Sequence, residues 1–517
     1  MGRDLAKTFT MILPFRLFFF AIIAATLVYG RTFAAEIRTP SAPRAPRING
    51  PDIFGVHPGS PFLYHIPATG DRPMTFWISH LPEGLMLDPN TGNITGSLAK
   101  AGDYAVVFHA RNKLGGAKKN FKIVVGETIS LTPAMGWNSW NHYAEHITQA
   151  LVVSNAQAMV GSGLIDHGWT YINVDDTWQG PRGGPFHALQ GDAKFPDIKT
   201  MCDTVHALGL KVGLYSTPWT TSYADHIGGS SDNSEGIWTN PIPFKKGFFI
   251  GQYHFATNDA DQWAAWGVDY VKYDWYPNQL PETTEMADAL RHSGRDIVFS
   301  LSNNMNPTNG PTIGKIANSW RTTGDIKANW RSQVHNALAQ EQWMPFSSPG
   351  HWNDPDMLEI GTRERGQSGL KPDEEYLHMT FWCLGASPLL LGNDLTGMDA
   401  FTLNLLENDE VIAVDQDELG RQAALISASG QSIRIGSSTN VPPLQVWARP
   451  LADGSHAVGL FNFGDTATNV TVTWTELQIS GRHRVRNLWR KENLGRFKGQ
   501  FSMPVAAHSA ELVKISP

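Results

Sequence analysis

Between residues 131 and 420 the chain alternates short apolar runs with longer amphipathic segments. The apolar run at 171–176 predicts a strand, the 3.6-residue period at 197–208 predicts a helix, and the run at 211–215 predicts the next strand. About eight such units over roughly 290 residues match the size and rhythm of a (β/α)8 TIM barrel. A doubly wound open sheet is the alternative, but no glycine-rich phosphate fingerprint follows its first strand.

The regions on either side of this alternation show no helical period. Residues 36–126 contain short alternating runs broken by turn-forming sequences, which predicts a small β-sandwich. Within 421–517, two alternating runs flank Asp453 and Gly454 as the arms of a hairpin, and we expect a second, antiparallel β-sandwich there. The expected organisation is a barrel at 127–420 between these two sandwiches.

Residues 1–35 have the pattern of a targeting segment. Basic residues precede an apolar run at 17–29, and small residues follow at Ala34 and Ala35. The run is shorter than the roughly 20 apolar residues of a membrane span. We interpret the segment as a signal peptide cleaved near Ala34 and Ala35, with an uncleaved anchor as the alternative. The mature protein is expected to be secreted or periplasmic, without stable membrane insertion.

Charge and cysteine content narrow the functional classes. A net charge of -7 leaves no excess of basic residues to hold nucleic acid by counterion release, so no nucleic-acid partner is expected. The two cysteines, Cys202 and Cys383, both fall in apolar helical segments. A disulfide framework is therefore not expected to hold this protein together, and its apolar cores must do so.

The run at residues 268–276 predicts a strand with an unusual pair of charges. In a strand, residues two apart share a face, so Lys272 and Asp274 point the same way. Burying both is costly unless they pair with each other or with a ligand. A solvent-facing pair on an edge strand is the alternative.

Polar and aromatic residues stand at the ends of nearly all the predicted barrel strands, where TIM barrels build their sites. Asp354 and Asp356 alone would suit a turn and a helix cap. Placement at successive strand ends is difficult to explain by structure alone. The residues at these ends are Trp137, Trp140, Asp175, Asp176, Tyr215, Lys272, Asp274, Ser302, Asn303, Arg321, Asp325, Asp354 and Asp356.

These residue types describe a sugar site, because several carboxylates, a lysine, an arginine and aromatic side chains come together. The chain shows no phosphate loop, no His-rich metal pattern and no serine elbow. Oxygen ligands from Asp175, Asp176, Asp354 and Asp356 would suit magnesium or calcium. A lysine and an arginine in the same pocket argue against a metal, and we expect neither a metal nor an organic cofactor.

A long segment at 218–255 interrupts the alternation after the third predicted strand. It is rich in Gly, Ser, Asn and aromatic residues. Loops of this length are usually functional or disordered. Because it leaves the barrel on the predicted site face, we expect it to wall the pocket.

Five ordered motifs carry a resemblance to glycoside hydrolase family 27, the α-galactosidase and α-N-acetylgalactosaminidase family. They are MGWNSW at 135–140, NVDDTW at 173–178, YVKYD at 270–274, RTTGD at 321–325 and WNDPDM at 352–357. The similarity covers more than half the chain, and residues 36–126 resemble the Ig-like modules attached to some bacterial members. The resemblance implies a (β/α)8 barrel flanked by an Ig-like β-sandwich and a C-terminal antiparallel β-sandwich.

The resemblance also implies roles for individual residues. Asp274, at the end of YVKYD, matches the family's nucleophile, and Asp325, at the end of RTTGD, matches the acid/base. The positions that match its substrate-binding residues are Trp140, Asp175, Asp176, Tyr215, Lys272, Arg321 and Asp356.

Physical reasoning agrees with these roles. Lys272, on the same face as Asp274, should favour the ionised form that a nucleophile requires. Asp325 must start protonated, and a carboxylate about 5 Å away would raise its pKa. Two carboxyls that close imply a covalent glycosyl-enzyme and retention of anomeric configuration.

The identity of the sugar rests on fewer residues. The family's galactosidases usually carry a bulky group at the end of the fifth strand, whereas Ser302 resembles the small residue of the N-acetylgalactosaminidases, and Met305 nearby could refill the space. The half-cystine that often follows the nucleophile is absent, because Trp275 and Tyr276 stand there. We expect an α-galactoside oligosaccharide or polysaccharide as the substrate. The alternatives are an α-N-acetylgalactosaminidase, a β-L-arabinopyranosidase, which a paired Asp175 and Asp176 disfavours, and a catalytically silent carbohydrate-binding barrel.

Overall fold

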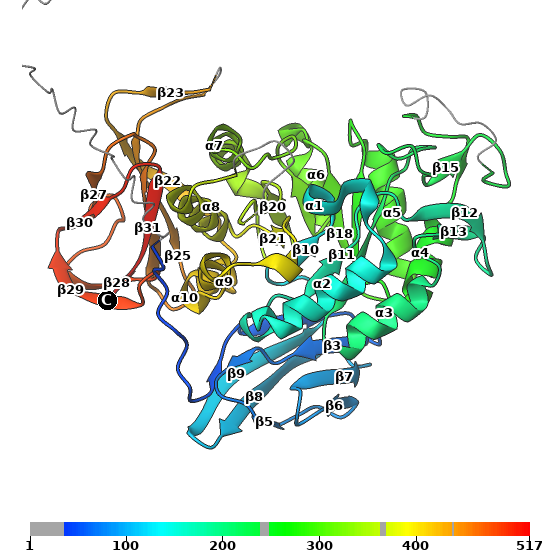
Figure 1. Ribbon diagram of the computed structural model, residues 1–517, viewed down its shortest axis with the longest axis horizontal. Coiled ribbons are helices and arrows are strands. Elements are labelled where there is room, and N and C mark those ends of the chain that lie inside the picture. Colours follow the sequence, from blue (N-terminus) through cyan, green and yellow to red (C-terminus); the bar gives the residue numbers. More distant parts are fainter. Residues whose placement is uncertain (1–35, 238–247, 362–368, 437–438) are drawn as a thin grey trace, which may run out of the picture. The chain divides into compact units, whose positions relative to one another are not determined.

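The computed structural model describes residues 36–237, 248–361, 369–436 and 439–517 (Figure 1). Within it, Ile37–Pro517 form one compact unit. The expected signal peptide at 1–35 lies outside the described residues and stays a prediction. None of the described helices is both long and apolar enough to cross a membrane.

Eight parallel strands follow one another around a sheet in chain order, and the last lies beside the first. They are β10 (Met135–Asn138), β11 (Tyr171–Asn173), β14 (Lys211–Ser216), β17 (Tyr270–Asp274), β18 (Val298–Ser302), β19 (Ser319–Arg321), β20 (Trp352–Asp354) and β21 (Leu389–Leu391). β10 pairs with both β11 and β21. A parallel bridge between Leu358, just after β20, and Leu391 joins the remaining edge. The sheet closes, which confirms the predicted (β/α)8 barrel.

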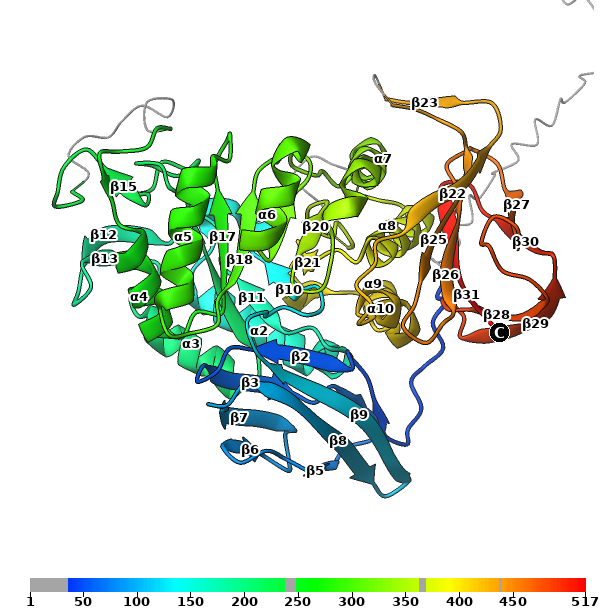
Figure 2. The same cartoon turned by 180° about the vertical axis from the view of Figure 1, so that it is seen from behind.

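Helices pack around the strands in both views of the barrel (Figures 1 and 2). They are α1 (Trp140–Tyr143), α2 (Gln149–Gly161), α3 (Ile198–Ala207), α4 (Ala256–Trp266), α5 (Leu280–His292), α6 (Gly310–Ile316), α7 (Trp330–Leu338), α8 (Pro372–Gly385), α9 (Ala400–Leu406) and α10 (Asp409–Asp415). Trp137 lies inside β10, fully buried, and its indole nitrogen donates to the Asn393 carbonyl at 2.7 Å. It is a core residue, so its place among the candidate site residues was wrong.

Helix α4 begins at Ala256, whereas the pattern of the sequence predicts a helix only over 261–266. Its first turn contains Asp259, which is fully buried and pairs with Arg182 at 2.6 Å. An ion pair with a distant residue, rather than an apolar stripe, holds this end of the helix against the protein. Hydrophobic periodicity therefore could not reveal it.

The N-terminal β-sandwich consists of a four-stranded sheet in the order β2-β9-β8-β5 and a three-stranded sheet in the order β3-β7-β6. Its strands are β2 (Ile53–Val56), β3 (Pro61–His65), β5 (Thr75–Ser79), β6 (Leu85–Leu87), β7 (Asn93–Ser97), β8 (Gly102–Asn112) and β9 (Gly115–Val125), with a small pair β1 (Arg47–Ile48) and β4 (Ala68–Thr69) beside them. Polar contacts tie it to the barrel. Asp296 accepts from the backbone of His57 at 3.0 Å and from the Ser60 hydroxyl at 2.9 Å, and Arg72 pairs with Asp166 at 2.6 Å.

The C-terminal β-sandwich packs a six-stranded antiparallel sheet in the order β22-β25-β26-β31-β28-β29 against the pair β27-β30. Its strands are β22 (Ala424–Ser429), β25 (Leu444–Pro450), β26 (His456–Asn462), β27 (Thr468–Thr473), β28 (Arg482–Asn487), β29 (Glu492–Lys498), β30 (Gln500–Val505) and β31 (Ser509–Ser516), and β23 (Ile433–Ile435) pairs with β24 (Thr439–Val441). Leu444 opposes Asn462 across β25 and β26, which confirms the predicted hairpin.

The barrel shares its apolar core with the C-terminal sandwich but not with the N-terminal one. One continuous core includes the barrel together with C-terminal residues such as Trp447 and Phe461, whose rings lie 5.1 and 5.2 Å from that of Phe381 on α8. The N-terminal sandwich has a core of its own. Cys202 and Cys383 are both buried and free, as predicted. Apolar packing, not cross-linking, therefore holds the described chain together.

Candidate active site

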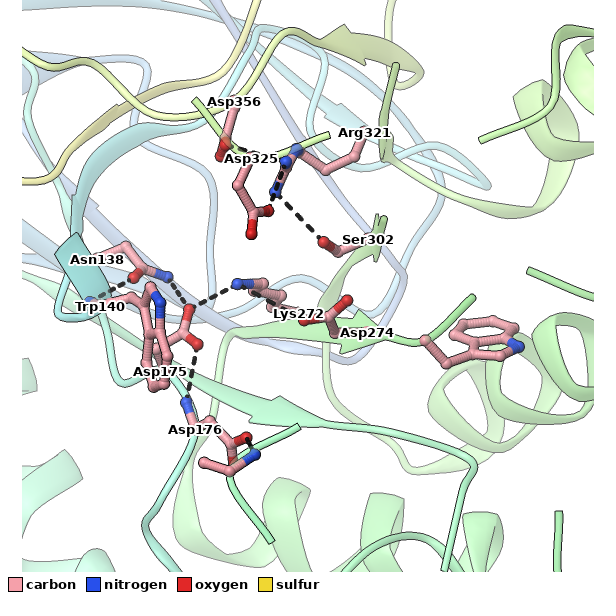
Figure 3. A network of polar contacts seen from close by, with 12 residues as sticks. Asn138, Trp140, Asp175, Asp176, Lys272, Asp274, Ser302, Arg321, Asp325 and Asp356 are labelled. Atoms are coloured by element: carbon pink, nitrogen blue, oxygen red, sulfur yellow. Dashed lines mark hydrogen bonds and ion pairs between the residues drawn. The ribbon is translucent and has the colours of Figure 1, made fainter. Parts of the chain in front are cut away.

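The predicted site residues meet at the C-terminal ends of the barrel strands (Figure 3). Asp175 and Asp176 follow β11, Lys272 and Asp274 end β17, and Ser302 ends β18. Arg321 ends β19, and Asp325 and Asp356 lie in the segments after β19 and β20. Parallel strands of a closed barrel all point the same way, so residues distant in sequence reach one rim.

Lys272 connects two carboxylates of the site. Its ammonium nitrogen lies 2.8 Å from Asp175 Oδ2 and 4.0 Å from Asp274 Oδ2, and Figure 3 shows it between them. Burial would lower the pKa of Lys272, but the two carboxylates raise it above its ordinary value, so the ammonium stays charged. The Asn138 amide also donates to Asp175 Oδ2, at 2.8 Å.

Asp274 is buried, and its Oδ1 has no hydrogen-bond partner among the described residues. Burial raises the pKa of this carboxyl to about 6, and the Lys272 ammonium counteracts that effect only in part. Lys272 therefore acts in the expected direction, although desolvation has the larger effect on the pKa of Asp274. A buried acceptor without a partner is the group that a bound polyol would satisfy.

Arg321 connects the opposite side of the site. Its Nη2 lies 3.0 Å from Asp325 Oδ1 and 2.9 Å from Asp356 Oδ2, and Nη1 donates to the Ser302 hydroxyl at 3.4 Å. The Asp325 side chain is 74% exposed. Desolvation in the cleft would raise its pKa, but the charges of Arg321 and Lys272 hold it below the usual range. The expectation of a raised pKa for Asp325 was thus wrong, because the charges of Arg321 and Lys272 outweigh desolvation.

Asp356 has a backbone conformation that non-glycine residues seldom adopt, with a φ of 86°. Its N–H donates to Asp354 Oδ1, and its Oδ2 accepts from the backbone of Ile326, both at 2.8 Å. These bonds hold the strained residue so that its carboxylate meets Arg321. Burial raises the pKa of Asp354 to about 6. Asp354 therefore positions the loop, while Asp356 positions the guanidinium.

Asp176 has most of its acceptor capacity occupied by protein. Its Oδ1 accepts from the Thr177 backbone at 2.7 Å and from the Gln179 amide at 3.1 Å. Its Oδ2 accepts from the Ala224 backbone at 3.1 Å, and the Ser222 hydroxyl also bonds the carboxylate. In this structure Asp176 anchors the long loop that follows β14. A contact with the sugar's hydroxyls stays a prediction.

The two aromatic candidates border the same cluster. Trp140 is partly exposed, and its backbone N–H donates to Asn138 Oδ1 at 2.9 Å. Tyr215 is buried, its ring lies 5.5 Å from the Lys272 ammonium, and its hydroxyl has no partner among the described residues. The Trp140 ring can offer an apolar face to a sugar ring, and the Tyr215 hydroxyl can donate a hydrogen bond to it.

The sequence reasoning did not single out Asn138 or residues 222–224. Asn138 precedes the polar strand ends and looks like the end of a buried strand, and only its amide contact with Asp175 reveals it. Residues 222–224 reach the site through tertiary contacts with Asp176 that no local pattern shows. The aromatic content of segment 218–255 was the feature of the sequence that could have indicated a role for these residues at the site.

Two of the four aspartates considered as metal ligands pair with cations instead. Asp175 pairs with Lys272 and Asp356 pairs with Arg321. Within the part of the chain that the structure describes, no group of three His, Cys, Asp or Glu residues is placed to hold a metal ion. What remains is a buried carboxyl and an exposed carboxyl, each beside a cation, at the rim of a barrel. Such a pair can perform nucleophilic and acid/base chemistry on a glycosidic bond.

Comparison with known proteins agrees with this geometry. The family profile described as alpha galactosidase A matches residues 132–417. The chain belongs to this family, glycoside hydrolase family 27. Profiles for the alpha galactosidase C-terminal beta sandwich domain and for an Ig domain match residues 441–515 and 45–126, which confirms the predicted architecture of a barrel between two β-sandwiches.

Individual family members cover most of the chain. Alpha-galactosidase 2 of Arabidopsis thaliana is 36% identical over 403 residues, covering 76% of this chain and 92% of its own length. A candidate alpha-galactosidase from Bacteroides fragilis, solved by crystallography, superposes with a TM-score of 0.78 at 32% identity and covers 92% of this chain and 98% of its own. A β-L-arabinopyranosidase of this family from Geobacillus stearothermophilus gives a TM-score of 0.63 at 27% identity, covering 75% and 97%.

Proposed function

We propose that this family 27 member is an exo-acting, retaining α-galactosidase that releases terminal α-linked galactose from oligosaccharides or polysaccharides. The observation that carries the proposal is the placement of Asp274 and Asp325 on one rim, each beside a cation, with Asp175 held by Lys272. Family members named alpha-galactosidase at 32–36% identity support the choice of sugar.

The reaction assigned to the site has two steps. Asp274 attacks the anomeric carbon and forms a glycosyl-aspartate, while Asp325 gives its proton to the departing oxygen. Asp325 then takes a proton from water, which attacks the anomeric carbon and releases the sugar with its configuration retained. Lys272 and Arg321 stabilise the negative charges of the two carboxylates, and neither of them needs to transfer a proton.

Substrate binding must reverse the order of the two pKa values found in the free site. A sugar hydroxyl that donates to the unpaired Asp274 Oδ1 lowers the pKa of the nucleophile, because a hydrogen bond favours the ionised form. The same sugar excludes water from the exposed Asp325 side chain, and this desolvation raises the pKa of the acid/base. The site binds one proton before the reaction, and the substrate determines which carboxyl carries it.

One observation favours a second substrate. Ser302 is small and buried, and it faces Arg321 at the end of the strand where the family separates galactose from N-acetylgalactosamine. The engagement of Asp176 by residues 222–224 also weakens the case against a pentopyranoside. An α-N-acetylgalactosaminidase and a β-L-arabinopyranosidase are therefore the alternatives.

A parallel assay tests these assignments. Purified protein is offered aryl α-galactoside, α-N-acetylgalactosaminide and β-L-arabinopyranoside, with an Asp274→Asn variant as the control for contaminating enzymes. We expect the α-galactoside to be hydrolysed fastest and the variant to be inactive on all three, with an unchanged circular dichroism spectrum. Hydrolysis of none by the wild type would reject the proposal in favour of a carbohydrate-binding barrel.

We also propose that the protein is exported. The pattern of residues 1–35 supports this proposal. Amino-terminal sequencing of the mature protein tests the proposal. A start near Ala35 is expected, and a mature chain that begins at Met1 would contradict it.

A further inference from the structure

Tyr223 lies at the tip of a small hairpin in the loop after β14, on the face of the barrel that carries the site. Thr221 and Ile227 form an antiparallel bridge, and the Ser222 N–H donates to the His226 carbonyl at 2.8 Å. Asp225, with a φ of 61°, makes the turn between them. Tyr223 is thus held by a defined turn rather than by an extended stretch of loop.

Both neighbours of Tyr223 are fixed to the same carboxylate. The Ala224 N–H donates to Asp176 Oδ2 at 3.1 Å, and the Ser222 hydroxyl bonds Asp176 as well. Asp176 belongs to the segment after β11, so a rigid element of the barrel sets the position of the hairpin. Because bonds on either side fix the backbone, the Tyr223 side chain has little freedom to leave the site.

The Tyr223 ring is fixed by aromatic packing. It meets Trp219 edge to face at 5.1 Å and Phe248 at 5.2 Å, and those two rings stack on each other at 4.7 Å. Edge-to-face pairs of this kind stabilise the packing of aromatic rings beyond the effect of burial alone. The side chain is only partly buried. Part of it is therefore accessible to a bound molecule.

The Tyr223 hydroxyl lies near the two carboxyls to which the reaction is assigned. It shares a hydrogen bond with the Asn303 side chain, and it is close enough to Asp274 and Asp325 for both charges to act on it. Burial, followed by those two carboxylates, raises the pKa of Tyr223 above its ordinary value, so the hydroxyl keeps its proton. In a retaining glycosidase the scissile bond lies between the two carboxyls. A neutral donor thus stands beside that bond.

We propose that Tyr223 is a substrate-positioning residue that determines specificity on the leaving side of the scissile bond. Its hydroxyl, oriented by Asn303, donates to an oxygen of the departing sugar, and its ring forms the wall against which that sugar packs. The inference deepens the function proposed above and rests on it. Its competitor is a purely structural tyrosine that only fills the space between Trp219, Phe248 and the barrel.

The test compares leaving groups. Wild type and Tyr223→Phe are assayed on a nitrophenyl α-galactoside, which lacks a leaving sugar, and on an α-galactosyl disaccharide. Loss of one hydrogen bond predicts about a tenfold fall in kcat/KM on the disaccharide and a smaller change on the aryl substrate. Tyr253→Phe is the matched control, because Tyr253 belongs to the same loop but is exposed and makes no hydrogen bond to the site carboxylates within the described part of the chain. It should match the wild type on both substrates.

Asn303→Ala supplies the second variant. If Asn303 orients the hydroxyl, this variant should reproduce the selective loss, and the double variant should lose little more than either single one. Equal loss on both substrates by Tyr223→Phe, or no loss on either, would overturn the inference while leaving the enzyme's function intact. A wild type inactive on both substrates would instead overturn the proposed function, and the inference with it.

Discussion

At the scale of single residues, the positive charge of Lys272 affects the pH dependence of the reaction. Its ammonium lies 4.0 Å from Asp274 and lowers the pKa of a carboxyl that burial raises to about 6. The reaction needs one proton on the two carboxyls, and the free site holds that proton on Asp274 only below a pH of about 6, so kcat/KM should fall as the pH rises through about 6. The fall reports the free enzyme, before a sugar donates to Asp274.

Replacing Lys272 with methionine should move this alkaline limb to higher pH. The substitution keeps the length of the side chain but removes the cation, so the pKa of Asp274 rises further and the site keeps its proton to a higher pH. The measurement is a kcat/KM profile from pH 4 to 8 on the preferred aryl glycoside. Lys199→Met is the control, since Lys199 pairs with Asp203 on the exposed face of α3. An alkaline limb that stays in place would show that Lys272 does not act on Asp274.

At the scale of elements, the repeat of strands and helices was visible in the sequence, whereas the contacts that fix the loops were not. The alternation of apolar runs located the barrel strands, and their ends located Asp175, Lys272, Asp274 and Arg321, because a parallel barrel places all such ends on one rim. The pKa order of Asp274 and Asp325 could not be predicted, because it depends on burial and on distances that no spacing contains.

The Arg182–Asp259 pair is such a contact, and it joins three elements. Arg182 ends the hairpin strand β12 (Gln179–Gly183), Asp259 lies on α4, and Arg182 Nη2 donates to the Gly228 carbonyl in the long loop at 2.9 Å. The two side chains are 1% and 0% exposed, with 2.6 Å between Nη1 and Oδ1. The Leu189 backbone on β13 (Ala188–Gly191) also donates to Asp259, at 3.0 Å.

Asp259→Ala should therefore destabilise the protein by about 3–5 kcal/mol, because it leaves the Arg182 charge buried without its partner. Asp203→Ala removes a carboxylate from an exposed pair on the neighbouring helix and should cost no more than about 1 kcal/mol. Urea denaturation followed by tryptophan fluorescence compares the two. If both variants unfold at the same urea concentration, the buried pair does not hold these elements together.

At the scale of the whole molecule, a histidine contact gives the junction between the N-terminal sandwich and the barrel a pH dependence. His57 Nδ1 lies 2.6 Å from Asp296 Oδ1, and this hydrogen bond raises the pKa of His57 while partial burial opposes it. A raised pKa means that the stabilisation is complete below the ordinary histidine pKa of about 6.5 and is lost as the pH rises through the raised value.

His57→Gln should remove this dependence. The difference in melting temperature between wild type and variant should be larger at pH 6 than at pH 9, with a contribution of roughly 1 kcal/mol or less because the imidazole is partly exposed. The backbone bond from residue 57 to Asp296 survives the substitution, so the junction itself should persist. A difference that grows toward high pH would contradict the assigned direction.

The distribution of apolar cores predicts which core substitutions lower the thermal stability of the active site. Phe461 is fully buried in the core that the barrel shares with the C-terminal sandwich, whereas Phe108 stacks on Phe121 at 4.3 Å in the separate N-terminal core. Truncating either ring to alanine should cost its own core about 3–5 kcal/mol. Since the barrel carries the carboxylates, Phe461→Ala should lower the temperature at which hydrolysis is lost. Phe108→Ala should leave that temperature nearly unchanged, while it lowers the midpoint of a separate calorimetric transition that occurs at lower temperature. The junction at Asp296 and Asp166 is polar and transmits little of the lost packing energy. A single transition that both substitutions lower equally would show instead that these polar contacts unite the two cores into one cooperative unit.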